Sequence, residues 1–284
     1  MIRISKRADM PQSKRWIIRI SAIILALAIM SFFFIFLGHN PLEVYQTLIT
    51  GSLGTYNRFV KTIELVIPLS LSALGIMIAF KMKFWNIGAE GQIVVGAIAA
   101  TFVALNFSEL NSVLLLSMMF IASALAGGIY AFIPAIFKVK FKTNETLFTL
   151  MLNYIALRYV TYLQYGPWKD PAARGFPKIA NFAQNARLPR VFQINAGWII
   201  LIVFVALIYV LMNKSKLGYE IAVIGESQKT AKYAGMNVAK VIVMALFISG
   251  ALSGIVGMIQ VAGVNYTLSD QVSGGMGFTA IIIA

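Results

Sequence analysis

The side chains with the most chemical potential in this chain lie in a short segment, residues 84–92, between two long apolar stretches. The segment carries the amides of Asn86 and Gln92, the carboxylate of Glu90 and two glycines that permit a tight or broken backbone. Polar side chains and irregular backbone are costly near hydrocarbon unless protein or a water-filled path surrounds them. The segment therefore predicts a place where a membrane protein handles a polar solute.

Glu90 has two interpretations. A helix that begins near Ala89 would place Glu90 in its first turn, where the positive end of the helix dipole favours an acid. Alternatively, a broken helix near the middle of the membrane could place Glu90 on a transport path. The residues leave both interpretations open.

A second polar segment begins at Thr143. Asn144 and Glu145 are typical of the start of a helix. Asn153 lies deeper, inside an apolar run, where its amide needs a partner on another helix or a place on the solute path. Both possibilities for Asn153 remain open.

A third feature is the polar segment 213–240. Within it, Glu226 to Ala234 predicts a two-turn helix, and Gly235 is well placed to end that helix in the left-handed conformation. Ala231, Tyr233 and Ala234 would offer a small contact face. Such a helix, lying parallel to the membrane, would suit docking to a cytoplasmic partner.

Several kinds of chemistry find no support in the residues. The chain has no cysteine and one histidine, His39 at a helix exit, and its ten carboxylates do not show metal-ligand spacing. The segment Gly225–Thr230 has the wrong glycine-to-lysine spacing for a phosphate loop. We expect no catalytic residue, metal or cofactor, and an ATPase that drove transport would be a separate chain.

The elements that hold these residues are long apolar segments. The chain is 59% hydrophobic and 12% charged, with a mean hydropathy of +0.81. Runs close to the length needed to cross a bilayer cover residues 17–37, 63–80, 91–107, 112–137, 146–165, 196–212 and 241–262, and another opens at Phe278. The fold prediction is an all-α polytopic transmembrane bundle with about eight helices. The first run has no cleavage-site pattern and is interpreted as a retained helix rather than a signal peptide.

The net charge of +14 does not indicate nucleic-acid binding, because most of the 24 basic residues fall in segments that alternate threading places on the cytoplasmic side. Residues 1–16 form the cytoplasmic basic N-terminal segment. Residues 17–284 form one transmembrane domain, with 213–240 cytoplasmic and the proline-rich loop 166–195 extracytoplasmic. Within this domain, Gly250 and Gly254 in one helix, and Gly127 in another, predict close helix packing.

Three segments together resemble the permease subunits of bacterial ABC importers: Asn86–Gln92, Asn144–Tyr154 and Gly218–Gly235. The closest branch is that of the simple-sugar and nucleoside permeases, which are related to the branched-chain amino acid and ribose permeases. The resemblance covers essentially the whole chain.

The resemblance implies a bundle built on an internal repeat, in the bacterial inner membrane, with a cytoplasmic N-terminus. It implies an ABC ATPase subunit, a second permease subunit of the same or another chain, an extracytoplasmic solute-binding lipoprotein and membrane lipid as partners. Two groups of residues are implied by the family motifs. The substrate path would include Asn86, Glu90, Gln92 and Asn153, and coupling to the ATPase would involve Gly225, Glu226, Ala231, Tyr233 and Gly235.

The segment Gly274–Thr279 looks like the second-repeat counterpart of the Asn86–Gln92 break. Because the sequence stops inside an apolar run, we expect the chain to be incomplete at its C-terminus relative to this family.

Three alternatives are weighed against this interpretation. A branched-chain amino acid ABC permease would share the same architecture. An ion-coupled secondary transporter or channel should carry more ionisable residues within its helices than Glu64 and Arg158. A membrane-embedded enzyme would need an acid–base pair or a metal cluster, and the inner carboxylates lack a partner histidine.

Overall fold

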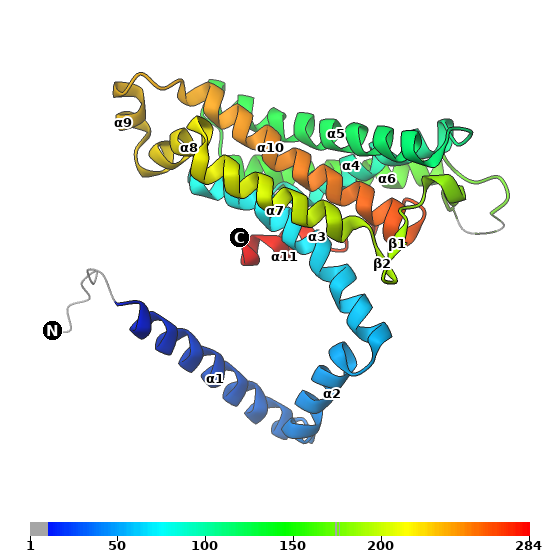
Figure 1. The fold of residues 1–284 in the computed structure, drawn as a ribbon, viewed down its shortest axis with the longest axis horizontal. Coiled ribbons are helices and arrows are strands. Elements are labelled where there is room, and N and C mark those ends of the chain that lie inside the picture. The colour runs from blue at the N-terminus through cyan, green and yellow to red at the C-terminus, as the bar shows by residue number, and fades with distance from the viewer. Residues whose placement is uncertain (1–10, 174, 176) are drawn as a thin grey trace. The chain divides into compact units, whose positions relative to one another are not determined.

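A computed structural model describes residues 11–173, 175 and 177–284 of this chain (Figure 1). Helices dominate the described residues, which confirms the prediction of an all-α fold. The chain divides into two compact units, Met1–Thr62 and Ile63–Ala284. The second unit contains all the candidate site residues.

The first unit consists of α1 (Gln12–Phe36), α2 (Pro41–Leu53) and the start of α3 (Tyr56–Lys81). The Asn40 side chain accepts a hydrogen bond from the Leu42 N–H, and Pro41 occupies the first position of α2, where its missing N–H costs nothing. The Tyr45 hydroxyl donates to the Leu27 carbonyl at 2.7 Å and so joins α2 to α1.

The second unit contains most of α3 and eight further α-helices among the described residues. These are α4 (Ala89–Asn106), α5 (Ser112–Phe141), α6 (Glu145–Tyr165), α7 (Gly197–Lys214), α8 (Lys216–Glu226), α9 (Gln228–Tyr233), α10 (Val238–Ile259) and α11 (Met276–Ile283). A π-helical turn, η2 (Gln260–Asn265), extends α10. The loop between α6 and α7 holds a 3₁₀ turn, η1 (Gln184–Ala186), and an antiparallel pair of short strands, β1 (Arg190–Val191) and β2 (Ile194–Asn195).

Six of the described helices are long and apolar enough to cross a membrane: α1, α3, α4, α5, α7 and α10 with its π-helical extension. The prediction of a polytopic membrane bundle is therefore confirmed at this level. Every predicted apolar run is helical, but α6 does not reach the apolarity of the other six, because its sequence includes Asn153, Arg158 and Gln164.

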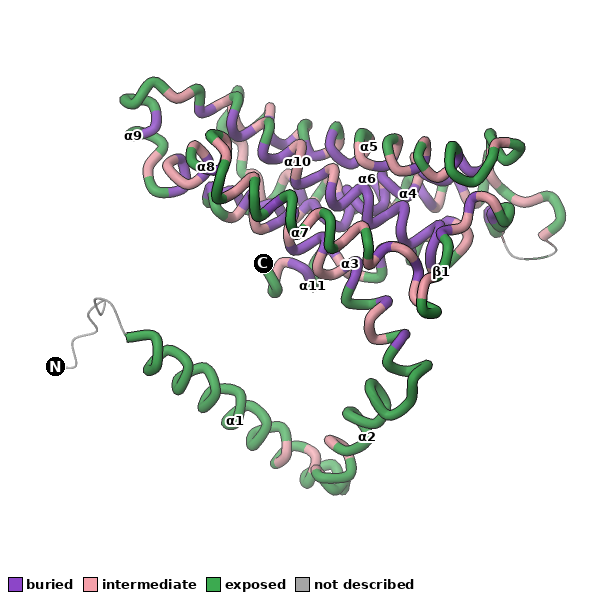
Figure 2. The backbone as a smooth tube through the Cα atoms, in the orientation of Figure 1, coloured by how far each residue is buried: buried purple, intermediate pink, exposed green. Residues whose placement is uncertain are grey.

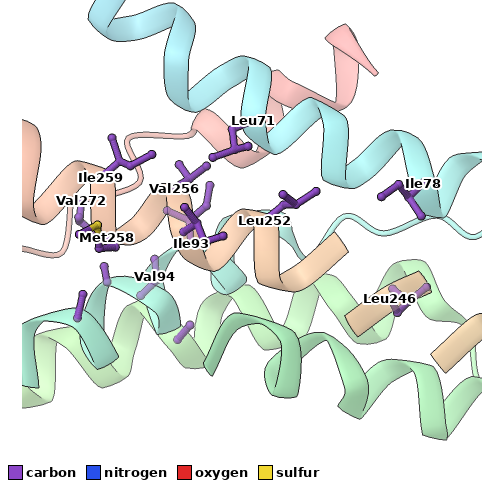
Figure 3. Packing of buried hydrophobic residues seen from close by; sticks show 14 of the residues in the cluster. Leu71, Ile78, Ile93, Val94, Leu246, Leu252, Val256, Met258, Ile259 and Val272 are labelled. Atoms are coloured by element: carbon purple, nitrogen blue, oxygen red, sulfur yellow. The ribbon is translucent and has the colours of Figure 1, made fainter. Parts of the chain in front are cut away.

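The core of the second unit forms where α10 packs against α5, α4 and α3. Side chains such as Leu71, Ile93 and Val256 interdigitate there (Figure 3), and burial concentrates along α10, α4 and the later turns of α3 (Figure 2). A Cβ added at Gly254 would collide with the Ser123 carbonyl, and one added at Gly127 would collide with the Gly250 carbonyl. The predicted close packing at these glycines is confirmed.

The loop between α6 and α7 is tied to the end of the helices rather than projecting freely. The Phe182 N–H donates to the Tyr266 carbonyl at 2.8 Å, and the Leu188 N–H donates to the Ala262 carbonyl at 2.9 Å. The guanidinium of Arg187 also lies 4.8 Å from the centre of the Tyr266 ring. These contacts hold the loop against the region where α10 ends.

Candidate functional site: a broken-helix junction and a peripheral helix

The segment between α3 and α4 is a helix break stabilised by paired amides. The Asn86 Oδ1 accepts hydrogen bonds from the Gly88 N–H at 3.1 Å and from the Gln92 Nε2 at 3.2 Å. The Asn86 Nδ2 donates to the Ser249 Oγ on α10 at 3.2 Å. The break predicted from the sequence is therefore confirmed. Asn86 joins it to α10, and Gln92 bonds to the Asn86 amide.

Asn153 joins α6 to the same break. Its Oδ1 accepts from the Gly91 N–H at 2.9 Å, and its Nδ2 donates to the Ile87 carbonyl at 2.9 Å. Both backbone groups lie where the break interrupts regular helical hydrogen bonding, so the amide replaces the missing helical partners. The question that the sequence left open for Asn153 has a structural answer: its amide has partners on another segment.

Glu90 lies in the first turn of α4, which begins at Ala89 as predicted. Its carboxylate, however, reaches α11: Oε1 accepts from the Gly275 N–H at 2.9 Å and Oε2 from the Gly277 N–H at 2.7 Å. A carboxylate that accepts backbone N–H groups at the start of a helix is stabilised by charge-assisted hydrogen bonds and by the helix dipole. Glu90 thus connects the starts of two helices, α4 and α11.

The backbones at this contact approach very closely. A Cβ added at Gly277 would collide with the backbone nitrogen of Glu90, and Gly275 has a φ of +77°, which favours glycine. The segment that resembles a second-repeat counterpart of the first break therefore lies directly against it.

The structure brings all four sequence-predicted path residues into one buried cluster around the two helix starts. Asn86, Glu90, Gln92 and Asn153 are at most 3% exposed. Their side chains bond to protein groups, so in this conformation they fix the geometry of the junction.

Two residues of the junction were not singled out from the sequence. The Ser249 Oγ accepts a hydrogen bond from the Asn86 Nδ2. Gln260 is 3% exposed, and its Nε2 lies 3.5 Å from the Met276 Sδ at the start of α11. Gln260 opens the π-helical turn, a feature often found at functional sites. A single amide within the apolar run 241–262 was the signal that could have identified it.

The segment 213–240 contains α8 and α9, which lie at one end of the bundle (Figure 1). The predicted helix Glu226–Ala234 is shorter than expected, because Glu226 ends α8 and Ser227 caps α9 through the Thr230 N–H. Gly235 follows α9 with a φ of +76°, which confirms its predicted left-handed conformation.

The predicted coupling residues divide into an exposed and a buried set. Tyr233 is 93% exposed, and Glu226 and Gly235 are also exposed. Ala231 is fully buried, so the prediction that it belongs to an exposed contact face is wrong: its methyl group faces inward and packs in the core. Gly225 is buried as well, and a Cβ there would collide with the Lys81 carbonyl at the end of α3.

Comparison with known proteins places the sequence of this chain in a family. A model of the family described as "Branched-chain amino acid transport system / permease component" matches residues 58–284. The chain belongs to this family of permease components. No solved structure matches the permease.

Curated relatives of the permease are similar along most of their length. It is 31% identical to the glucose ABC transporter permease protein TsgB13 of Haloferax volcanii, over 92% of this chain and 72% of the relative. It is also 31% identical to the guanosine ABC transporter permease protein NupP of Bacillus subtilis, over 93% and 77% of the two chains. The nucleoside ABC transporter permease protein NupB of Lactococcus lactis is 26% identical to this chain, over 96% of this chain and 78% of the relative.

Proposed function

We propose that this chain is the membrane permease subunit of an ATP-driven importer that takes up nucleosides or simple sugars. The observation that carries the proposal is the family match over residues 58–284, together with relatives that are named as guanosine, nucleoside and glucose ABC permeases. The family description also names branched-chain amino acids, so an amino acid importer is the second candidate.

The permease spans the cell membrane several times, with its N-terminus in the cytoplasm and about eight helices arranged as an internal repeat. The distribution of charge supports this orientation. The end of the second unit that holds α8 and α9 also carries basic residues at the ends of α3, α5 and α7, such as Lys81, Lys138 and Lys214. Basic residues collect on the cytoplasmic side of membrane proteins.

The ATPase subunit contacts the exposed side of α9 and its flanks, at Glu226, Tyr233 and Gly235. A second permease subunit of the same or another chain, an extracytoplasmic solute-binding lipoprotein and membrane lipid complete the assembly. Tyr233 supports this placement, because a 93% exposed aromatic side chain is a strong candidate for burial against a partner.

The proposed mechanism is alternating access without covalent chemistry on the solute. Movement of the ATPase displaces α9 and α8, and the close contact of Gly225 with the Lys81 carbonyl passes this displacement to the end of α3. The chain continues from there to Asn86 within a few residues. The cluster of Asn86, Glu90, Gln92 and Asn153 then acts as the hinge at the solute path.

The experiment that tests the proposal measures uptake of radiolabelled guanosine, glucose and leucine in cells that lack the gene for this chain. Cells complemented with the wild-type chain should regain ATP-dependent uptake of guanosine or glucose, and Tyr233→Ala should restore less than about a tenth of it while reaching the membrane in normal amount. Restoration of leucine uptake alone would favour the second candidate. Full uptake in vesicles without an ATPase would overturn the proposal.

A further inference from the structure

The outward side of α6 has a composition that differs from the other membrane helices. The helix packs against the rest of the unit through one side, which consists of the buried residues Thr149, Asn153, Ala156, Val160 and Leu163. The opposite side exposes Leu147, Met151 and Ile155. Beside them it exposes one arginine and a row of tyrosines: Tyr154, Arg158, Tyr159, Tyr162 and Tyr165. We call this second set the α6 tyrosine face.

The exposed sides of the neighbouring helices show what a lipid-facing surface looks like in this molecule. On α5 the exposed large side chains include Leu114, Ile121, Leu125 and Ile129, and on α7 they include Ile202, Val203, Val205 and Leu207. These surfaces present mainly aliphatic and phenylalanine side chains, and Tyr209 on α7 is one exposed tyrosine among them. A face with a guanidinium and phenol hydroxyls would bring strong hydrogen-bonding groups into hydrocarbon, where they are unfavourable.

The depth of two residues argues against a simple interfacial role for the face. Tyrosines are common where helices meet the headgroups, and long basic side chains can extend toward them. Tyr165 and Tyr162, at the end of α6, fit that pattern. Arg158 lies roughly 10 Å, and Tyr154 roughly 16 Å, before the end of the helix at 1.5 Å per residue. Tyr154 also lies roughly 14 Å after the start of α6 at 1.5 Å per residue. It is therefore far from both ends of the helix and too deep for an aromatic belt at the headgroups.

The tyrosine face also carries a shallow, open depression with a mainly apolar lining. It has a volume of about 420 Å³ and is lined by Tyr154, Ile155, Arg158, Tyr159 and Tyr162. The rings of Tyr159 and Tyr162 are stacked with their centres 6.0 Å apart. Flat aromatic surfaces beside a guanidinium can stack on a base or on the apolar face of a sugar ring, while the guanidinium donates hydrogen bonds to hydroxyl or carbonyl oxygens.

We propose that the α6 tyrosine face is a solute-contacting wall of the transport path, and that it recognises a neutral solute with a ring and several hydrogen-bond acceptors, such as a nucleoside or a sugar. This inference rests on the proposed function and makes it more specific. Asn153, on the other side of the same helix, holds the broken-helix junction. A single helix thus joins the solute wall on one side to the hinge on the other.

Cysteine accessibility tests the proposal without relying on transport, and the chain has no cysteine of its own. The variants Tyr154→Cys, Arg158→Cys and Tyr162→Cys are made in the full chain in native membranes. Leu125→Cys and Ile129→Cys on the exposed side of α5 serve as lipid-facing controls, because they are 49% and 57% exposed. The probe is a membrane-impermeant, positively charged methanethiosulfonate, which reacts with a hydrated thiolate.

We expect the α6 thiols to react at least about tenfold faster than the α5 controls, since a charged reagent and a thiolate are both excluded from hydrocarbon. We also expect guanosine or glucose to slow the labelling at Tyr154→Cys and Arg158→Cys. Labelling as slow as at Leu125→Cys would overturn the proposal and assign the face to lipid. Oxidative crosslinking of two copies without reagent access would assign it to a protein interface and would equally overturn it.

A second measurement separates solute contact from a structural role. In the complemented cells, Arg158→Lys should retain part of the uptake, whereas Arg158→Gln should raise the KM for the solute at least about fivefold with normal protein in the membrane, because the amide supplies fewer donors than a guanidinium. An unchanged KM in both variants would overturn the proposal. If uptake by the wild type remains ATP-dependent in that case, the importer function stands and only the assignment of the wall fails.

Discussion

The carboxylate of Glu90 accepts a hydrogen bond at 2.7 Å from the backbone N–H of Gly277, a residue 187 positions later in the chain. The bond connects the first turn of α4 to the first turn of α11, and the second carboxylate oxygen bonds to Gly275. Because both helix starts share one buried acid, α4 and α11 cannot separate at this point without leaving a carboxylate or backbone N–H groups unpaired. The proposed movement at the junction must therefore exchange these bonds for others.

The first prediction concerns the charge of that acid. Glu90→Gln presents an amide of nearly the same shape, but one oxygen is replaced by an NH₂ group that cannot accept a hydrogen bond from a backbone N–H. We expect the free energy of unfolding to fall by about 2 kcal/mol, since a hydrogen bond to a charged group is lost in a buried site. Thermal unfolding of the purified chain in detergent measures the change.

The matched control for this change is Glu109→Gln. Glu109 is exposed in the loop between α4 and α5, so the same chemical substitution should leave the unfolding temperature nearly unchanged. Equal stability of the Glu90→Gln variant and the wild type would contradict the role of the carboxylate as a connection between the two helices.

The second prediction concerns the amide of Asn153. Asn153→Ala leaves the Gly91 N–H and the Ile87 carbonyl without their partner in a buried position. We expect a loss of about 2–4 kcal/mol in unfolding free energy, because each unpaired buried group costs roughly 1–3 kcal/mol. Asn213→Ala is the control, because the Asn213 amide is exposed and bonds to the Tyr209 carbonyl one turn earlier in its own helix.

Hydrogen exchange would show where the effect of Asn153→Ala occurs. The amide of Gly91 should exchange faster in the variant, while amides in the middle of α7 keep their wild-type rates. Unchanged protection at Gly91 would show that another group replaces the asparagine oxygen.

The third prediction concerns the contact between α10 and α5. A methyl group at Gly254 would collide with the backbone carbonyl of Ser123, and neither backbone can move without disturbing the packing around it. We expect Gly254→Ala to lower the unfolding free energy by about 1–3 kcal/mol. Gly51→Ala on α2 is the control, since open space surrounds that position, and a smaller effect at Gly254 than at Gly51 would refute the packing argument.

The fourth prediction separates the buried and the exposed residue of α9. Ala231→Leu inserts three carbons into a fully buried position and should destabilise the chain by about 1–3 kcal/mol. Tyr233→Ala should change stability by less than about 0.5 kcal/mol, because a surface side chain away from structural contacts is removed. The two variants, compared by thermal unfolding, should differ clearly, and similar losses in both would mean that Tyr233 packs within this chain.

The sequence by itself determined the long apolar helices, but not α2 or α8, which no apolar run predicted. Uninterrupted apolar runs can satisfy their backbone groups in a membrane only as helices, so the runs predicted α1, α3, α4, α5, α7 and α10 directly. Local chemistry also determined the start of α4 at Ala89, the cap of α6 at Asn144 and the left-handed Gly235, because each depends on hydrogen bonds or dihedral angles within a few residues.

Only the tertiary structure decided how the polar residues are used. The partner of Glu90 lies 187 residues away, and the partners of Asn153 lie on another helix, so no local pattern could identify them. The inward direction of Ala231 and the outward direction of Tyr233 likewise depend on the rotation of a short helix about its axis, which its contacts with the core set rather than its own composition. A polar side chain in an apolar run indicates that a partner must exist, and the arrangement of the helices determines which group that partner is.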